Sequence, residues 1–248
     1  MNPILSVTGL GVSFGKRVVI ENLSFGVDAG DCLAIIGPNG AGKTVLLKAL
    51  LGLLPHNGEI RWRADARLGY VPQKISADRQ LPLRVKDLLD AKVRTLKLTG
   101  QELDSVYSEI GLAPEILNTP IGNLSGGQFQ KVLIGFALLG RPNVLLFDEP
   151  TASLDELTEE RIYELLHALQ KEEAMTVLLV SHDLSVVYRY ATQVLCLSKG
   201  RPCMGPPQEI LTPERLEELY AAPPKYYRHV GQGREPQREK SGSSGPSK

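Results

Sequence analysis

The chain has 248 residues, of which 42% are apolar and 23% are charged, and its formal net charge is zero. This composition is typical of a folded globular protein and excludes a disordered chain. The charge balance gives no electrostatic reason to expect DNA or RNA as a partner. No apolar run approaches the ~18 residues that span a bilayer, and the N-terminus shows no signal peptide. We therefore expect an intracellular protein that reaches a membrane only through a partner.

The first part of the chain is predicted to form strands around one helix. Short runs rich in valine, isoleucine and phenylalanine alternate with turn residues. One later segment instead repeats leucines at helical spacing. The expected strands are Leu5–Phe14, Val18–Val27, Asp31–Ile36, Gly58–Arg63 and Arg67–Pro72, and the expected helix is Lys43–Leu54.

The middle of the chain changes to helical periodicity, with glycine and proline between the segments. The expected helices are Leu83–Arg94, Gln101–Ile110 and Gln128–Leu139. We interpret residues 72–140 as a helical insertion that interrupts a larger unit, residues 1–71 together with 141–224.

Strand and helix then alternate, which indicates a mostly parallel sheet with helices on both faces. The expected strands are Asn143–Asp148, Met175–Ser181 and Gln193–Leu197, and the expected helices are Leu157–Lys171, Leu184–Ala191 and Pro213–Tyr220. Residues 225–248 contain hardly any apolar side chains, so we expect a disordered tail.

The three cysteines, Cys32, Cys196 and Cys203, are an odd number without CxxC spacing. This argues against a disulfide framework and against a structural zinc site. We expect buried or inert thiols.

A phosphate-binding loop follows the strand that ends at Ile36. Its sequence fits G-x-x-x-x-G-K-[ST], in which backbone N–H groups surround phosphate oxygens, the lysine reaches the β- and γ-phosphates, and the hydroxyl ligates Mg²⁺. The helix start adds its positive dipole end. The strand before the loop and the amphipathic helix after it exclude a chance glycine-rich turn. The loop consists of Gly37, Pro38, Asn39, Gly40, Ala41, Gly42, Lys43 and Thr44.

Two carboxylates, Asp148 and Glu149, end an apolar strand further along. We expect Asp148 to hold Mg²⁺, as the aspartate of a Walker-B strand does. Glu149 lies where open α/β sheets place ligands, and it is the candidate general base for an attacking water. Alone, such a pair would as readily be a solvated cap of a strand, but the phosphate loop favours the catalytic interpretation.

The segment Leu124–Gln128 reads LSGGQ and lies between these two motifs, before a helix. With them, the chain resembles the ATP-binding-cassette (ABC) ATPases over residues 4–220. The resemblance implies a P-loop NTPase core of α/β class with a mostly parallel sheet, an N-terminal antiparallel β subdomain and an inserted α-helical subdomain. It also implies ATP and Mg²⁺ as cofactors, and a head-to-tail dimer in which Ser125, Gly126, Gly127 and Gln128 face the γ-phosphate held by the second copy.

Further positions match the family pattern one by one. Gln73 resembles the glutamine that reaches the metal and the attacking water, and His182 resembles the histidine that contacts the γ-phosphate. Phe14 resembles the aromatic residue that stacks on adenine, and Asp155 belongs to a segment similar to the D-loop. Val45, where a second hydroxyl residue is common, and Lys131, where arginine is usual, depart from the pattern without touching the central chemistry.

A single cassette without a long coiled coil resembles the separate ATPase subunit of a prokaryotic importer. The segments Leu68–Lys74 and Val180–Leu184 are similar to those of zinc and manganese importers. The resemblance implies partner permease subunits, an indirectly coupled substrate-binding protein, and a place on the inner face of the cell membrane. Three alternatives remain: an importer ATPase for an iron chelate or another small solute, a soluble non-transport ABC ATPase, and a small-molecule P-loop kinase, which would give LSGGQ no role.

Overall fold

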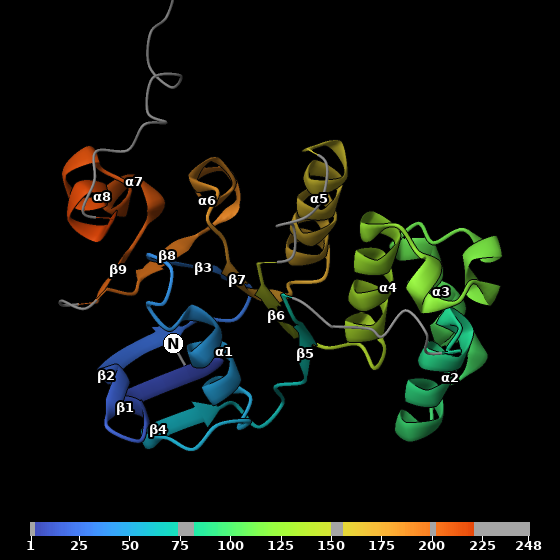
Figure 1. Ribbon diagram of the computed structural model, residues 1–248, viewed down its shortest axis with the longest axis horizontal. Helices are drawn as coiled ribbons and strands as arrows, with labels where there is room; N and C mark the ends of the chain where they lie inside the picture. Colours follow the sequence, from blue (N-terminus) through green and yellow to red (C-terminus); the bar gives the residue numbers. More distant parts are fainter. Residues whose placement is uncertain (1–2, 74–81, 150–155, 199–201, 221–248) are drawn as a thin grey trace, which may run out of the picture.

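The computed structural model describes residues 3–73, 82–149, 156–198 and 202–220. Within them, the strands form two sheets (Figure 1). A three-stranded antiparallel sheet has the order β2-β1-β4, and a six-stranded sheet has the order β5-β6-β7-β3-β8-β9. The strands are β1 (Leu5–Phe14), β2 (Arg17–Val27), β3 (Cys32–Ile36), β4 (Asn57–Trp62), β5 (Leu68–Val71), β6 (Val144–Asp148), β7 (Thr176–Val180), β8 (Gln193–Cys196) and β9 (Cys203–Gly205).

The six-stranded sheet is parallel from β5 to β8, and β9 joins one edge as an antiparallel strand. Every residue of β3, β6 and β7 is buried. Strands covered on both faces are expected to be apolar throughout, which explains their continuous runs of valine, leucine and isoleucine. The predicted α/β class, with its parallel sheet and N-terminal antiparallel sheet, is confirmed.

Side chains of β3 alternate between two separate cores. Leu33 and Ile35 pack with α1 (Lys43–Leu50) and the three-stranded sheet. Ala34 and Ile36 pack with α6 (Leu184–Tyr190), α7 (Pro207–Ile210) and α8 (Pro213–Tyr220). In Figure 1, α1 and the small sheet lie on one side of the large sheet, and α5 (Glu156–Glu172), α6 and α8 lie on the other.

The helical segment contains α2 (Val85–Leu96), α3 (Gly100–Glu109) and α4 (Gly126–Leu138), joined by two short 3₁₀ turns, Pro114–Asn118 and Ile121–Asn123. It lies beside β5 at one edge of the large sheet (Figure 1). Its buried residues, such as Leu89 and Val132, share one core with Val71 and Phe147 of the sheet. The helices are therefore packed against the sheet and do not form a core of their own.

One predicted helix is shorter than expected, and one region contains elements that were not predicted. The helix expected to reach Leu54 ends at Leu50, because the Gly52 and Leu53 amides turn back to donate to the carbonyls of Ala49 and Lys48. The sequence pattern predicts no strand or helix over residues 203–210, which are few and contain glycine and proline, but β9 and α7 form there. The order of this region comes from pairing with β8 and from burial of Ile210.

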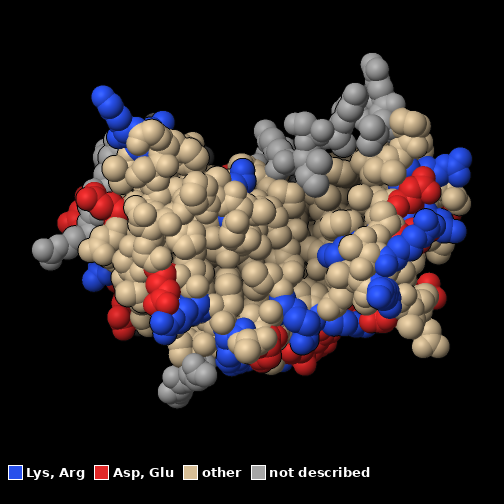
Figure 2. Space-filling model, turned by 90° about the horizontal axis from the view of Figure 1, so that it is seen from below, with Lys and Arg blue, Asp and Glu red and all other residues tan. Residues whose placement is uncertain are grey.

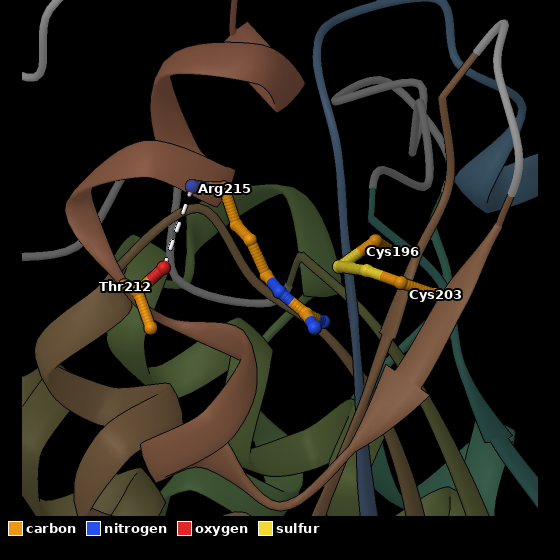
Figure 3. The surroundings of a disulfide bond; sticks show 4 residues. All are labelled: Cys196, Cys203, Thr212 and Arg215. Atoms are coloured by element: carbon orange, nitrogen blue, oxygen red, sulfur yellow. Dashed lines mark hydrogen bonds between the residues drawn. A yellow bond between two sulfur atoms is a disulfide. The ribbon is translucent and has the colours of Figure 1, made fainter.

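The expectation of buried or inert thiols is wrong for two of the cysteines. Cys196 and Cys203 face each other across β8 and β9 with 5.1 Å between their Cα atoms, and their sulfur atoms form a disulfide (Figure 3). Cys32 remains a free thiol, and burial, with a smaller effect from Asp31, raises its pKa to about 12. The pairing was missed because it depends on β9, which the sequence pattern does not reveal.

No helix in the described ranges combines the length and the apolar character needed to cross a membrane. On the face shown in Figure 2, basic and acidic side chains are interspersed and do not form one continuous field. This distribution matches the zero formal net charge.

Candidate nucleotide-binding site

The predicted phosphate loop connects the buried end of β3 to the first turn of α1. Gly42 is the N-cap of α1 and has φ 100°, and a Cβ atom there would lie 2.9 Å from Cγ1 of Val19. Such a backbone conformation and such close packing both require glycine. The loop therefore presents its backbone at a helix start, which is the arrangement that binds phosphate.

A cavity of about 430 Å³ opens beside this loop. Eight of the residues predicted for the site line it, drawn from β1, the loop, α1 and the ends of β5 and β6. Phe14, which is 50% exposed, stands at its border as an aromatic surface. The predicted residues that line the cavity are Phe14, Asn39, Gly40, Gly42, Lys43, Thr44, Gln73 and Glu149.

Lys43 lies at the base of the cavity with only 6% of its surface exposed. Its Nζ donates hydrogen bonds to the carbonyls of Gly37 at 2.9 Å and Pro38 at 3.3 Å. Burial lowers the pKa of Lys43, whereas Glu149 and Asp148 nearby oppose that shift. The loop thus holds a positive charge where the terminal phosphates of a nucleotide would bind.

Two of the three predicted Mg²⁺ ligands, Thr44 and Asp148, meet at the end of β6, whereas the third, Gln73, donates to Glu149. The Thr44 hydroxyl donates to Oδ1 of Asp148 at 3.0 Å, and the Tyr70 hydroxyl donates to Oδ2 at 3.4 Å. Burial raises the pKa of Asp148, and these hydrogen bonds oppose the increase. A hydroxyl and a carboxylate are hard oxygen donors of the kind Mg²⁺ prefers, so the residues present fit that ion.

Glu149 is at the centre of a cluster contributed by three other segments. Its Oε1 lies 3.5 Å from Nζ of Lys43 and 2.5 Å from Nε2 of His182, and its Oε2 accepts from Nε2 of Gln73 at 2.5 Å. Its φ is 43°, and its amide donates to the carbonyl of Val180 in β7. The structure therefore brings the predicted base together with the loop lysine and with Gln73 and His182, the two residues expected to contact the attacking water and the γ-phosphate.

Oε1 of Glu149 therefore faces Nζ of Lys43 and Nε2 of His182. The resemblance to the ABC ATPases assigns both of these nitrogen groups to contacts with the γ-phosphate. Glu149 is 11% exposed. An anion in that position matches the charge that a terminal phosphate would bring. The same donors can thus bind either the Glu149 carboxylate or a phosphate oxygen.

The predicted signature residues lie elsewhere. Ser125 caps α4: its Oγ accepts from the amide of Gln128 at 3.2 Å, and Oε1 of Gln128 accepts from the amide of Ser125 at 2.9 Å. Ser125 and Gly126 are exposed, and neither lines the cavity. Gly127 packs against Thr158, because a Cβ there would lie 2.8 Å from Cγ2 of that residue. The signature is a capped helix start turned toward solvent.

Sequence reasoning missed four residues of the site, and one predicted residue falls outside the described ranges. Arg17, Val19 and Val45 line the cavity, and Tyr70 contacts Asp148. Arg17 is paired directly with Phe14 in the β1–β2 hairpin, so a predicted hairpin could have identified it. Asp155 lies in the undescribed segment 150–155.

Comparison with known proteins gives a consistent result. A family model described as ABC transporter matches residues 20–152. A metal transport system ATP-binding protein of Thermotoga maritima is 36% identical over 220 residues, which cover 88% of this chain and 90% of that protein. The zinc import ATP-binding protein ZnuC of Pseudomonas putida is 37% identical, with coverage of 88% and 83%, and that of Magnetococcus marinus is 39% identical, with coverage of 84% and 78%.

Solved structures agree in fold. A structure described as an inward-facing, metal-chelate type ABC transporter has a TM-score of 0.80 at 30% identity and covers 90% of each chain. CbiO1 from Clostridium perfringens, described as part of the ABC transporter complex cbiONQ, has a TM-score of 0.73 at 27% identity, with coverage of 88% and 94%.

Proposed function

This chain belongs to the ABC transporter family, as one of its ATP-binding, ATP-hydrolysing subunits, and on that premise we propose that it powers the import of a metal ion, zinc or manganese, through partner permease subunits. The printed names of its relatives support the cargo, since two species supply zinc import proteins at 37% and 39% identity. The metal-chelate type neighbour favours a second candidate, an importer of an iron chelate.

The cluster around Glu149 is the observation that carries the catalytic part of the proposal. In this proposal Lys43 neutralises the terminal phosphates, and Gln73 and His182 position the attacking water and the γ-phosphate. Glu149 accepts the proton of that water as general base. Stabilisation of phosphate charge by preorganised donors is the largest contribution to phosphoryl transfer.

Thr44 and Asp148 would hold Mg²⁺, which when bound neutralises charge on the phosphate oxygens. Asp148 is 1% exposed and already accepts two hydrogen bonds, so its carboxylate is fixed in direction before any ion binds. Arg17 and Phe14 also border the cavity. We infer that Phe14 stacks on the base.

The exposed signature supports a composite site. Ser125, Gly126 and the start of α4 carry the polarity that binds an anion, but they do not line the cavity of their own chain. We infer that they complete the cavity of a second copy in a head-to-tail dimer that encloses two ATP molecules. Hydrolysis then depends on assembly, and the dimer is held to the inner face of the membrane through the permease.

The identity of the transported metal can be tested by measuring the metal content of cells. A Lys43→Ala variant in the source cell, grown with a chelator, is expected to lower zinc or manganese content measured by mass spectrometry. A loss confined to iron would favour the chelate importer. Unchanged metal contents, together with capture of ribosomes or DNA and no membrane protein, would favour a soluble ATPase.

A further inference from the structure

We propose that Cys196 and Cys203 are a reversible redox-modification site, open to small dithiols and disulfides, that controls the phosphate loop. The proposal needs nucleotide binding by the loop and does not depend on which metal is transported. It goes beyond catalysis by the residues described above. Neither cysteine contributes to the nucleotide cavity.

The two cysteines are direct cross-strand partners at the edge of the large sheet. Cys196 ends β8 and Cys203 begins β9, the last strand in the sheet order. Cys196 is 4% exposed, whereas Cys203 is partly exposed, so a small thiol can reach Cys203 first. The surroundings also include Thr212 and Arg215 at the start of α8 (Figure 3).

A short chain of backbone contacts connects this disulfide to Lys43 of the phosphate loop. The amide of Leu197, the residue after Cys196, donates to the carbonyl of Ile36 at 2.8 Å. The carbonyl oxygen of Leu197 lies so close to Gly37 that a Cβ atom there would be 2.2 Å away. The carbonyl of Gly37 in turn accepts the hydrogen bond from Nζ of Lys43 at 2.9 Å.

The disulfide therefore restrains Leu197, whose carbonyl oxygen is in close contact with Gly37, the first residue of the phosphate loop. Leu197, Ser198 and Pro202 also border a cavity of about 480 Å³ against β2 and Ala41. When the disulfide opens, Leu197 has space to shift away from Gly37 on the side of that cavity. Withdrawal would loosen the support of the loop and weaken nucleotide binding.

The chemistry is a two-step thiol–disulfide exchange. A thiolate of a small dithiol attacks Sγ of Cys203, which forms a mixed disulfide and releases Cys196 as a thiolate that takes a proton from water. The second thiol of the reagent attacks its own sulfur in the mixed disulfide, so that Cys203 leaves as a thiol and the reagent becomes a cyclic disulfide. The protein gains two electrons and two protons, and the dithiol loses them.

The redox state of the compartment bears on the role of this disulfide. In the intracellular location proposed above, thiol systems keep cysteines reduced, and the disulfides found there are usually transient or redox-sensing. Cys32 is an internal control, because its buried thiol, whose pKa burial raises to about 12, supplies little thiolate for exchange.

The test compares the full-length chain after treatment with oxidised glutathione and after treatment with dithiothreitol. Binding of a non-hydrolysable ATP analogue with Mg²⁺ is measured by calorimetry. The reduced protein is expected to bind about fivefold more weakly, the lower end of typical coupling between two sites. Maleimide labelling after denaturation is expected to find one free thiol in the oxidised chain and three in the reduced chain.

Variants separate this site from general thiol effects. Cys203→Ser and Cys196→Ser should each bind the ATP analogue as weakly as the reduced protein, and dithiothreitol should not change their affinity. Cys32→Ser should still lose affinity when it is treated with dithiothreitol. Three free thiols after oxidation, or equal affinities of the oxidised and reduced wild type, would overturn the proposal. The comparison of the oxidised and reduced wild type tests the proposal even if a serine variant fails to fold. A failure of the metal-import proposal would not change the result expected here.

Discussion

Replacement of Glu149 by glutamine separates the proposed chemistry from binding. The change removes a negative charge and keeps the shape of the side chain. Glu149 contacts Lys43, His182 and Gln73 at once, so the variant alters the centre of the cluster without opening a cavity. We expect ATP hydrolysis to be lost while ATP is still bound.

The size of the effect follows from the role assigned to the carboxylate. A general base contributes roughly a 10²–10⁴-fold rate increase. Its removal should therefore raise the barrier by about 3–5 kcal/mol. Two charges about 4 Å apart attract by about 4 kcal/mol at an effective dielectric of 20, so Lys43 also loses a gross attraction of that order. Its bonds to the Gly37 and Pro38 carbonyls remain, and an ATP γ-phosphate replaces the lost negative charge.

The assay combines phosphate release with calorimetric titration of ATP and size measurement in the presence of ATP. Turnover should fall at least about a hundredfold, with unchanged or tighter ATP binding and an ATP-dependent dimer. Glu160→Gln is the matched control, because that exposed carboxylate pairs with Arg189 outside the site. A Glu149→Gln protein that loses less than about tenfold in turnover would refute the assignment of the base.

Other substitutions separate binding from folding. Phe14→Ala should weaken ATP binding by about 3–10-fold through lost stacking, with the free energy of unfolding within about 0.5 kcal/mol of wild type, as calorimetry and urea titration would show. Phe147→Ala, at a fully buried position, should cost about 3–5 kcal/mol of stability, and a cost below about 1 kcal/mol would contradict the described core. Ser125→Ala should remove the cap of α4 at a cost of about 1 kcal/mol and should reduce turnover more than ATP binding; equal losses would argue against the composite site. Burial lowers the pKa of Lys92 to about 8 from its ordinary 10.5, so the unfolded chain binds more protons between these values and stability should rise with pH across that window. Urea unfolding at pH 7.5 and 9.5 should show this rise shrinking in Lys92→Met but not in Lys86→Met, which alters an exposed lysine of the same helix.

Local signals predicted much of this protein. The phosphate loop needs a run of residue types at fixed spacing, and the strand before it and the helix after it carry their own periodicity. The buried strands could be predicted because both of their faces are covered, so their residues are apolar except for Asp148 at the end of β6 and Thr176 at the start of β7. The helix expected over Gln128–Leu139 is present as α4, but it begins two residues earlier, at Gly126, where Ser125 and Gln128 form a capping pair within one turn.

Local sequence signals could not predict contacts between segments that are far apart in the chain. Glu149 meets Gln73, Lys43 and His182 only because parallel strands place their carboxyl ends at one edge of the sheet. The sequence predicted Lys43 and Glu149 from local motifs and Gln73 and His182 from a family resemblance, whereas the tertiary structure decided that the Glu149 carboxylate contacts the other three.

The phosphate loop shows the same division within a few residues. Its sequence by itself determined the binding of a nucleotide phosphate, since glycine backbone, lysine charge and helix start are local properties. Only the tertiary structure decided which residues from distant segments contact the loop. Leu197 reaches Gly37 because β8 pairs with β3, and Cys203 reaches Cys196 because the chain returns as β9. Strand pairing is set by the packing of the whole sheet, and no local pattern of residues specifies it.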